Sequence, residues 1–146
     1  MAVGGTVSKP IFVKDGQYLS MLCDNAVTLG NVVQITTTGT DTCDVGAANT
    51  VCAGVAVSGD RFSRTATDNV IAAGSYVTVC TRGVVYVYTG TNAITRGMFL
   101  EMGASGIVQP GGTAGSATEP KDIIGVALDA NGSAATTIRM QLRLGA

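Results

Sequence analysis

The chain has 146 residues, of which 46% are hydrophobic and only 13% are charged, and its formal net charge is −1. It contains no His, which removes the commonest general base and the commonest metal ligand. Its nine Lys and Arg residues are scattered, whereas tight nucleic-acid binding requires them to cluster. A mean hydropathy of +0.36 and so few charges leave the surface weakly protected against association, so we expect a protein that works within an assembly.

The first residues predict an extended N-terminal arm, residues 1–14, ahead of a β domain that covers residues 15–146. The pair Gly4-Gly5 lets the arm bend, and a disordered tail would have no use for the apolar residues that follow. We therefore expect an anchor that lies against a neighbouring subunit and consists of Pro10, Ile11, Phe12 and Val13. The alternative is a frayed terminus that makes no contact.

Beyond the arm the sequence indicates strands and almost no helix, because no long segment repeats its apolar residues at helical spacing. The clearest alternation is at the C-terminus, where Ile138, Met140 and Leu142 alternate with polar residues. Gly83 is predicted to mark a bulge or bend within a long strand pair. In chain order, the predicted strands are Tyr18–Cys23, Asn31–Thr36, Val51–Val57, Tyr76–Val79, Val85–Tyr88, Met98–Met102, Asp122–Leu128 and Thr137–Leu144. Turns are predicted at residues 14–16, 38–39, 58–60 and 131–132.

Two short sequence motifs occur twice along the chain, in the same order. Residues 26–33 are echoed by residues 93–100, and residues 51–57 are echoed by residues 123–128. Because a repeat constrains the architecture, we expect one small β unit to be built twice, in units of about residues 26–88 and 93–144. The expected fold class is all-β: a compact barrel-like or sandwich-like domain with an internal duplication.

Two predicted loops separate these elements. Residues 60–69 have no counterpart in the second copy, and such insertions carry contacts more often than core. Arg61, Phe62 and Arg64 are therefore candidate interface residues. Residues 109–120 are rich in Gly, Ser and Thr and are predicted to form a surface loop.

No group of residues in the sequence indicates a catalytic or metal-binding site. A Ser or Cys nucleophile needs a nearby base, and there is no His to supply one. The four cysteines lack the Cys-x-x-Cys spacing of zinc sites, and they are interpreted as buried thiols; the alternative is a disulfide between Cys43 and Cys52. We expect no catalytic residue, no metal site and no cofactor.

Taken together, the motifs resemble those of the phage capsid cement, or head decoration, proteins, a small all-β family. The resemblance spans about residues 12–144 and depends on the order of short glycine-led motifs more than on any single one. The motifs are residues 12–17, 26–33, 54–57, 73–79, 83–85, 94–97, 124–128 and 137–142.

This resemblance implies a structural virion protein, not an enzyme, that binds the outer surface of the major capsid protein lattice and stabilises the head. It also implies self-association, with a homotrimer preferred, and a location on the capsid exterior after synthesis in the host cytoplasm. Neither nucleic acid nor membrane is expected as a partner, because the cations are scattered and no apolar run approaches the length of a membrane span, roughly 18 residues. Two alternatives stay open: another virion β protein, such as a tail-tube or fibre component, and a secreted or surface-layer binding module. The second alternative predicts a signal peptide, which the first residues do not resemble.

Overall fold

The computed structural model describes residues 12–59, 69–113 and 123–144. In these residues the regular structure is β strand apart from one short 3₁₀ helix, η2 (Ala104–Gly106). Within the same ranges no helix is long and apolar enough to cross a membrane. The strands are β1 (Phe12–Cys23), β2 (Val27–Thr28), β3 (Val32–Ile35), β4 (Thr42–Val45), β5 (Cys52–Gly59), β6 (Val70–Ile71), β7 (Tyr76–Tyr88), β8 (Phe99–Met102), β9 (Val108–Pro110), β10 (Gly125–Ala127) and β11 (Thr137–Arg143).

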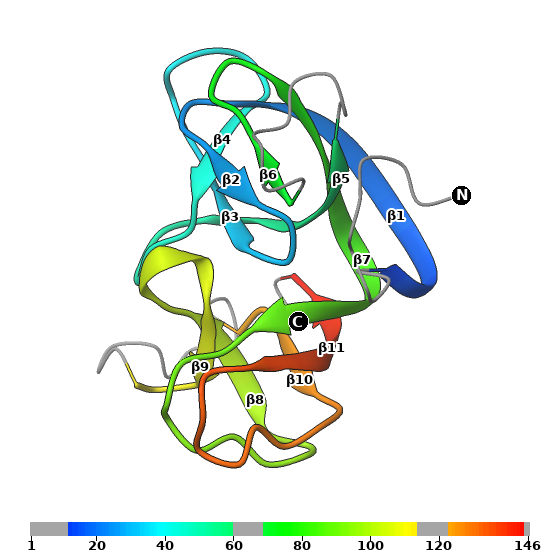
Figure 1. Ribbon diagram of the computed structural model, residues 1–146, viewed down its shortest axis with the longest axis vertical. Coiled ribbons are helices and arrows are strands. Elements are labelled where there is room, and N and C mark those ends of the chain that lie inside the picture. The colour runs from blue at the N-terminus through cyan, green and yellow to red at the C-terminus, as the bar shows by residue number, and fades with distance from the viewer. Residues whose placement is uncertain (1–11, 60–68, 114–122, 145–146) are drawn as a thin grey trace.

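Five of these strands close into a barrel, which occupies the upper half of Figure 1. Its order is β1-β4-β3-β5-β7, and β7 pairs back onto β1. Every pairing in the barrel is antiparallel except that of β1 with β4. The barrel strands bury one apolar cluster, to which Val27 of β2 and Ile71 of the short neighbouring strand β6 also belong. The cluster consists of Met21, Cys23, Val27, Leu29, Val33, Cys43, Ala53, Ala56, Ile71, Val77 and Val79.

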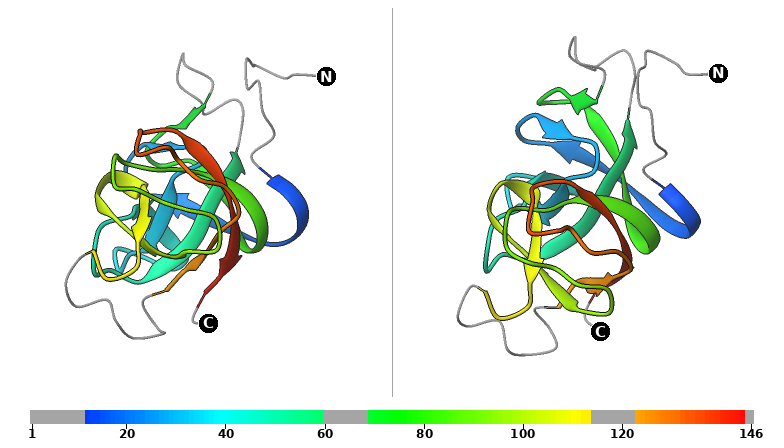
Figure 2. Two further views of the ribbon diagram at one scale, coloured as in Figure 1. Left: turned by 90° about the horizontal axis from the view of Figure 1, so that it is seen from below. Right: turned by 60° about the horizontal axis from the view of Figure 1, so that its bottom comes forward.

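Strand β7 belongs to the barrel and also continues the same nine-stranded sheet beyond it, in the order β7-β11-β10-β8-β9. This outer part of the sheet is called the second sheet below. Figure 2 shows this green strand running from the barrel to lie beside the red strand β11. Val77 and Val79 face the barrel cluster, whereas Val85 and Val87 face a second cluster under the second sheet. Between them Gly83 has φ +134°, a conformation that L side chains rarely adopt. The β1–β7 ladder shifts its register beside Gly83, between the pairs Lys14–Val84 and Gln17–Arg82, so the predicted irregularity in the strand pair is confirmed.

The internal duplication is visible in the hydrogen bonds. In the first copy β3 lies between β4 and β5, and in the second β8 lies between β9 and β10. The strand registers match, because Val33 lies opposite Gly54 and Leu100 lies opposite Gly125. Two further bonds repeat at 2.8 Å: the Gly30 N–H donates to the Ala56 carbonyl, and the Gly97 N–H donates to the Ala127 carbonyl. One β unit is therefore built twice, while the outer limits of residues 26–88 and 93–144 stay a prediction.

Several local expectations are wrong. The turn predicted at residues 14–16 lies inside β1, which begins at Phe12 rather than Tyr18 and pairs with β7 through three register shifts. The turn predicted at 58–60 fails because Ser58 and Gly59 continue β5. Strands β2, β4, β6 and β9 were not predicted, since each is only two to four residues long and too short to show a clear alternation. Strand β9 includes Gln109 and Pro110, so the loop predicted at residues 109–120 begins too early. The turn at Asn131-Gly132 is confirmed by the bond from the Ala134 N–H to the Asn131 carbonyl, 3.2 Å long.

The cysteines are unpaired. Cys23, Cys43 and Cys80 are buried, Cys52 is partly buried, and all four are free thiols. The disulfide considered between Cys43 and Cys52 does not form, because β3 lies between their strands. Two strand spacings separate their backbones by roughly 9–10 Å, and a disulfide spans at most about 7 Å between Cα atoms.

We predict that Gly54→Ala severely destabilises the barrel. Gly54 has φ +145°, and a methyl group there would collide with the backbone carbonyl of Cys80 in β7. Strain and overlap together should lower the free energy of unfolding by at least about 3 kcal/mol. Gly74→Ala is the matched control, because Gly74 also has positive φ but no atom within 4 Å of the added carbon. Thermal denaturation of the two variants checks this, and equal melting temperatures would contradict it.

Candidate functional site

The second sheet has one buried face and one open face. Strand β11 shows the alternation most clearly, with Ile138, Met140 and Leu142 buried, and Gln141 and Arg143 exposed. Residues that lie directly opposite one another on four neighbouring strands form a row on the open face, because their side chains lie on the same side of the sheet. This row, called the outer row below, consists of Val84, Gln141, Val126 and Phe99.

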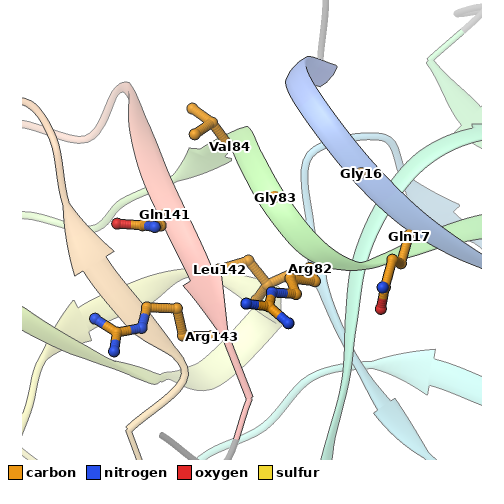
Figure 3. A pocket seen from close by; sticks show the side chains of 8 residues that line it. All are labelled: Gly16, Gln17, Arg82, Gly83, Val84, Gln141, Leu142 and Arg143. Atoms are coloured by element: carbon orange, nitrogen blue, oxygen red, sulfur yellow. The ribbon is translucent and has the colours of Figure 1, made fainter.

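Two arginines stand beside the outer row. Arg82 of β7 and Arg143 of β11 are opposed in the strand register, and both are exposed. They line a shallow hollow of about 600 Å³ where the start of β1 crosses β7. Figure 3 shows Arg82 between Gln17 on one side of this hollow and Gln141 and Arg143 on the other.

No carboxylate among the described residues neutralises the two guanidinium groups. Within the described ranges neither Arg82 nor Arg143 has an ion-pair partner. Like charges directly opposed on a sheet are destabilising, so the fold gains nothing from this pair. Their arrangement is suited to carboxylate groups brought by another molecule, because a guanidinium offers a fork of donors that matches a carboxylate.

Arg139 lies on the same face of β11, four residues before Arg143, but it has an ion-pair partner. Its guanidinium donates two hydrogen bonds to the Asp129 carboxylate, at 3.0 and 2.8 Å. The Arg139 backbone N–H adds a third bond to Asp129, at 2.9 Å. These bonds lower the pKa of Asp129 to about 2, chiefly through the guanidinium and against the cost of burial. The Arg139 guanidinium is thus used within the fold, whereas those of Arg82 and Arg143 can bind another molecule.

The outer row also has an apolar component. Phe99 is 59% exposed, an unusual position for a large aromatic side chain. Its counterpart in the first copy is Val32, because each lies opposite the matching valine, Val126 or Val55. Val32 is fully buried in the second cluster, where it packs against the C-terminal sheet. The same face of the repeated unit is therefore covered in the first copy and uncovered at Phe99 in the second.

The interface residues predicted from sequence are mostly untested. Pro10, Ile11, Arg61, Phe62 and Arg64 lie outside the described residues. The backbone of β1 includes Phe12 and Val13, and Phe12 lies opposite Val85 in the chain's own sheet. Whether these seven residues touch a partner stays a prediction.

Sequence reasoning missed the arginine pair, although a signal existed. Arg82 and Arg143 each lie in or next to a segment whose alternation predicts a strand, but only the strand register shows that the two residues lie opposite each other.

Among the described residues there is no group of three or more Cys, Asp and Glu side chains arranged to hold a metal ion. The all-β fold and this open face define a β protein with a surface suited to binding another protein.

The comparisons with known proteins agree with this class. The chain matches, over residues 4–143, the family described as "Structural cement protein (E217 gp24/Pam3 gp6)". It belongs to this family of phage structural cement proteins, so the resemblance found in the motifs is confirmed. No curated protein matches the chain.

A solved structure supports the fold. The N base of the head fibre protein gp8.5 of bacteriophage phi29 is similar with a TM-score of 0.58 and 16% identity. The similarity covers 87% of this chain and 93% of that one. The protein is accordingly a capsid-stabilising structural component of a phage particle, with a compact all-β fold.

We predict that Asp129→Asn lowers the melting temperature by a few degrees at pH 7, since the pair with Arg139 is more than one third exposed and solvent screens it. The folded pKa, about 2, lies below the ordinary 3.8, so the stabilisation is present above pH 4 and is lost as the pH falls through about 2. The difference between variant and native protein should therefore shrink over that interval. Asp41→Asn, at an exposed turn, is the control. A difference independent of pH from 7 to 2 would contradict the prediction.

Proposed function

We propose that the chain binds the outer surface of the major capsid protein lattice through the open face of its C-terminal sheet. The observation that carries this proposal is the pair Arg82 and Arg143, two exposed and unneutralised guanidinium groups opposed in one strand pair beside an apolar row. Membership of the cement family supports a capsid protein as the partner. Carboxylate side chains on the lattice would remove the repulsion between the arginines, and Phe99 and Val126 would contribute apolar burial.

A cement function needs many modest contacts rather than one tight contact. A head presents the same lattice site many times, so a small interface repeated over the surface gives a large total stabilisation. Holding two capsid subunits through linked contacts raises the effective affinity further. We propose that copies also associate with one another, with a trimer as the preferred state, because the chain has few charges and several exposed large apolar side chains.

We also propose that the protein is made in the host cytoplasm, is added to the outside of the head, and acts without catalysis, nucleic acid or membrane. The absence of His and the scattered cations support the first two exclusions. Particle imaging tests the location, since the proposal requires density for this chain outside the capsid shell.

We predict that replacing both arginines, Arg82→Gln with Arg143→Gln, weakens binding to phage heads that lack this protein by at least about tenfold. The substitutions keep hydrogen-bond donors and remove the charges, and both positions are exposed, so the melting temperature should change little. Co-sedimentation with heads at increasing protein concentration measures the affinity. The native protein should also lose affinity as salt is added, more steeply than the double variant.

The matched control is Arg96→Gln, an exposed arginine that does not line the hollow. It should bind heads as the native protein does. Equal affinity for the native protein and the double variant would remove the arginine pair from the interface. Failure of the native protein to bind heads at all would overturn the proposed function itself.

The predicted N-terminal arm has its own test. We predict that deleting residues 1–11 leaves the β domain folded, because the described sheet begins at Phe12, and reduces occupancy on heads. An extended segment with Ile11 would supply backbone hydrogen bonds and an apolar anchor to a neighbour. Thermal denaturation checks the fold and co-sedimentation checks occupancy. Unchanged occupancy would show that residues 1–11 are a tail without a contact.

A further inference from the structure

One strand pairing in the barrel is shorter than the others, that of β1 with β4, which is called the seam below. Strands β1 and β4 are joined by only two register pairs, Leu22 with Thr42 and Cys23 with Cys43, and they are the barrel's parallel pair. By contrast, β1 and β7 share eight register pairs. Parallel pairing is slightly less stable per residue, so closure of the barrel depends on its shortest ladder.

A thiol pair occupies that seam. Cys23 and Cys43 are directly opposed, with exposures of 1% and 0%, and both side chains belong to the barrel cluster. Neighbouring strands lie about 4.8 Å apart, which is within the separation of about 4.4–6.8 Å that disulfides span between Cα atoms. The two side chains are close enough for each to shift the pKa of the other.

The geometry points to Cys23 and Cys43 as a redox-active pair that forms a reversible disulfide and closes the barrel covalently. The oxidant is a small-molecule disulfide such as oxidised glutathione. The thiolate of one cysteine attacks a sulfur of that disulfide and releases one thiolate, which takes up a proton. The second cysteine then loses its proton and displaces the other half. In sum, two protein thiols are oxidised to one disulfide, and one small disulfide is reduced to two thiols.

The environment favours Cys23 as the first nucleophile. The neighbouring Cys43 side chain lowers the pKa of Cys23, although burial and the nearby charges of Asp44 and Asp24 oppose this. The Cys23 side chain, together with burial, raises the pKa of Cys43. Brief opening of the two-pair ladder gives the oxidant access, because short ladders open at low free-energy cost.

The other two thiols are excluded by position. Cys80 lies opposite Tyr18 and Val55, and Cys52 lies opposite Gln34, so neither faces a cysteine across a ladder. Burial raises the pKa of Cys52 to about 12, which leaves it almost wholly protonated at neutral pH. They therefore serve as internal controls for selective oxidation.

The test uses the purified full-length chain, incubated with oxidised glutathione and then alkylated under denaturing conditions. The expected result is that two of the four thiols resist alkylation. Digestion on the N-terminal side of Asp separates the cysteines, since Cys23 falls in peptide 15–23, Cys43 in peptide 41–43 and Cys52 in peptide 44–59. Mass spectrometry should then find peptide 15–23 linked to peptide 41–43.

Oxidation should also raise the melting temperature by about 10 °C, because the bond closes a loop of roughly 20 residues, and dithiothreitol should reverse the rise. The double variant Cys52→Ala with Cys80→Ala should keep the rise, and Cys23→Ala should lose it. If a variant does not fold, the peptide map of the native chain still decides. Four alkylatable thiols after oxidation, or a link involving Cys52 or Cys80, would overturn the inference. Neither outcome bears on capsid binding.

Discussion

The fold depends on one strand that serves two cores. Strand β7 pairs with β1 and β5 in the barrel and with β11 in the second sheet, so both sheets are built on it. Its residues Val77 and Val79 face the first cluster, and Val85 and Val87 face the second. A straight strand could not direct one face into two cores, which is why Gly83 adopts a conformation that side chains disfavour. Strand β1 follows the bend by shifting its register three times.

Duplication of the β unit explains the open surface. In the first copy, Val32 and Val55 are buried because the second copy packs over them. In the second copy the matching residues, Phe99 and Val126, have no further copy within the chain to cover them, and Phe99 is exposed. A chain with two stacked units thus ends in one uncovered face.

A cement protein has to hold its own shape while it holds its partner. The barrel is closed by ladders of very different length, and the shortest one carries the opposed thiols Cys23 and Cys43. Under reducing conditions these thiols would leave the chain free to fold and assemble, and later oxidation would close the β1–β4 pairing covalently. Stability added after assembly in this way would not slow folding, because the bond forms only between residues already opposed in the native fold.

The sequence by itself determined the class of fold, the repeat and the family. Period-two alternation in residues 137–143, the bend at Gly83 and the glycine-led phrases are local signals, because each depends on residues a few positions apart. The order of those phrases was enough to indicate a cement protein. Only the tertiary structure decided which strands are neighbours. It placed Arg82 opposite Arg143, put Cys43 beside Cys23 instead of Cys52, and showed that the weakly patterned segment Thr42–Val45 closes the barrel. These pairings join residues 20 to 61 positions apart, and they arise from strand register, which no local pattern encodes.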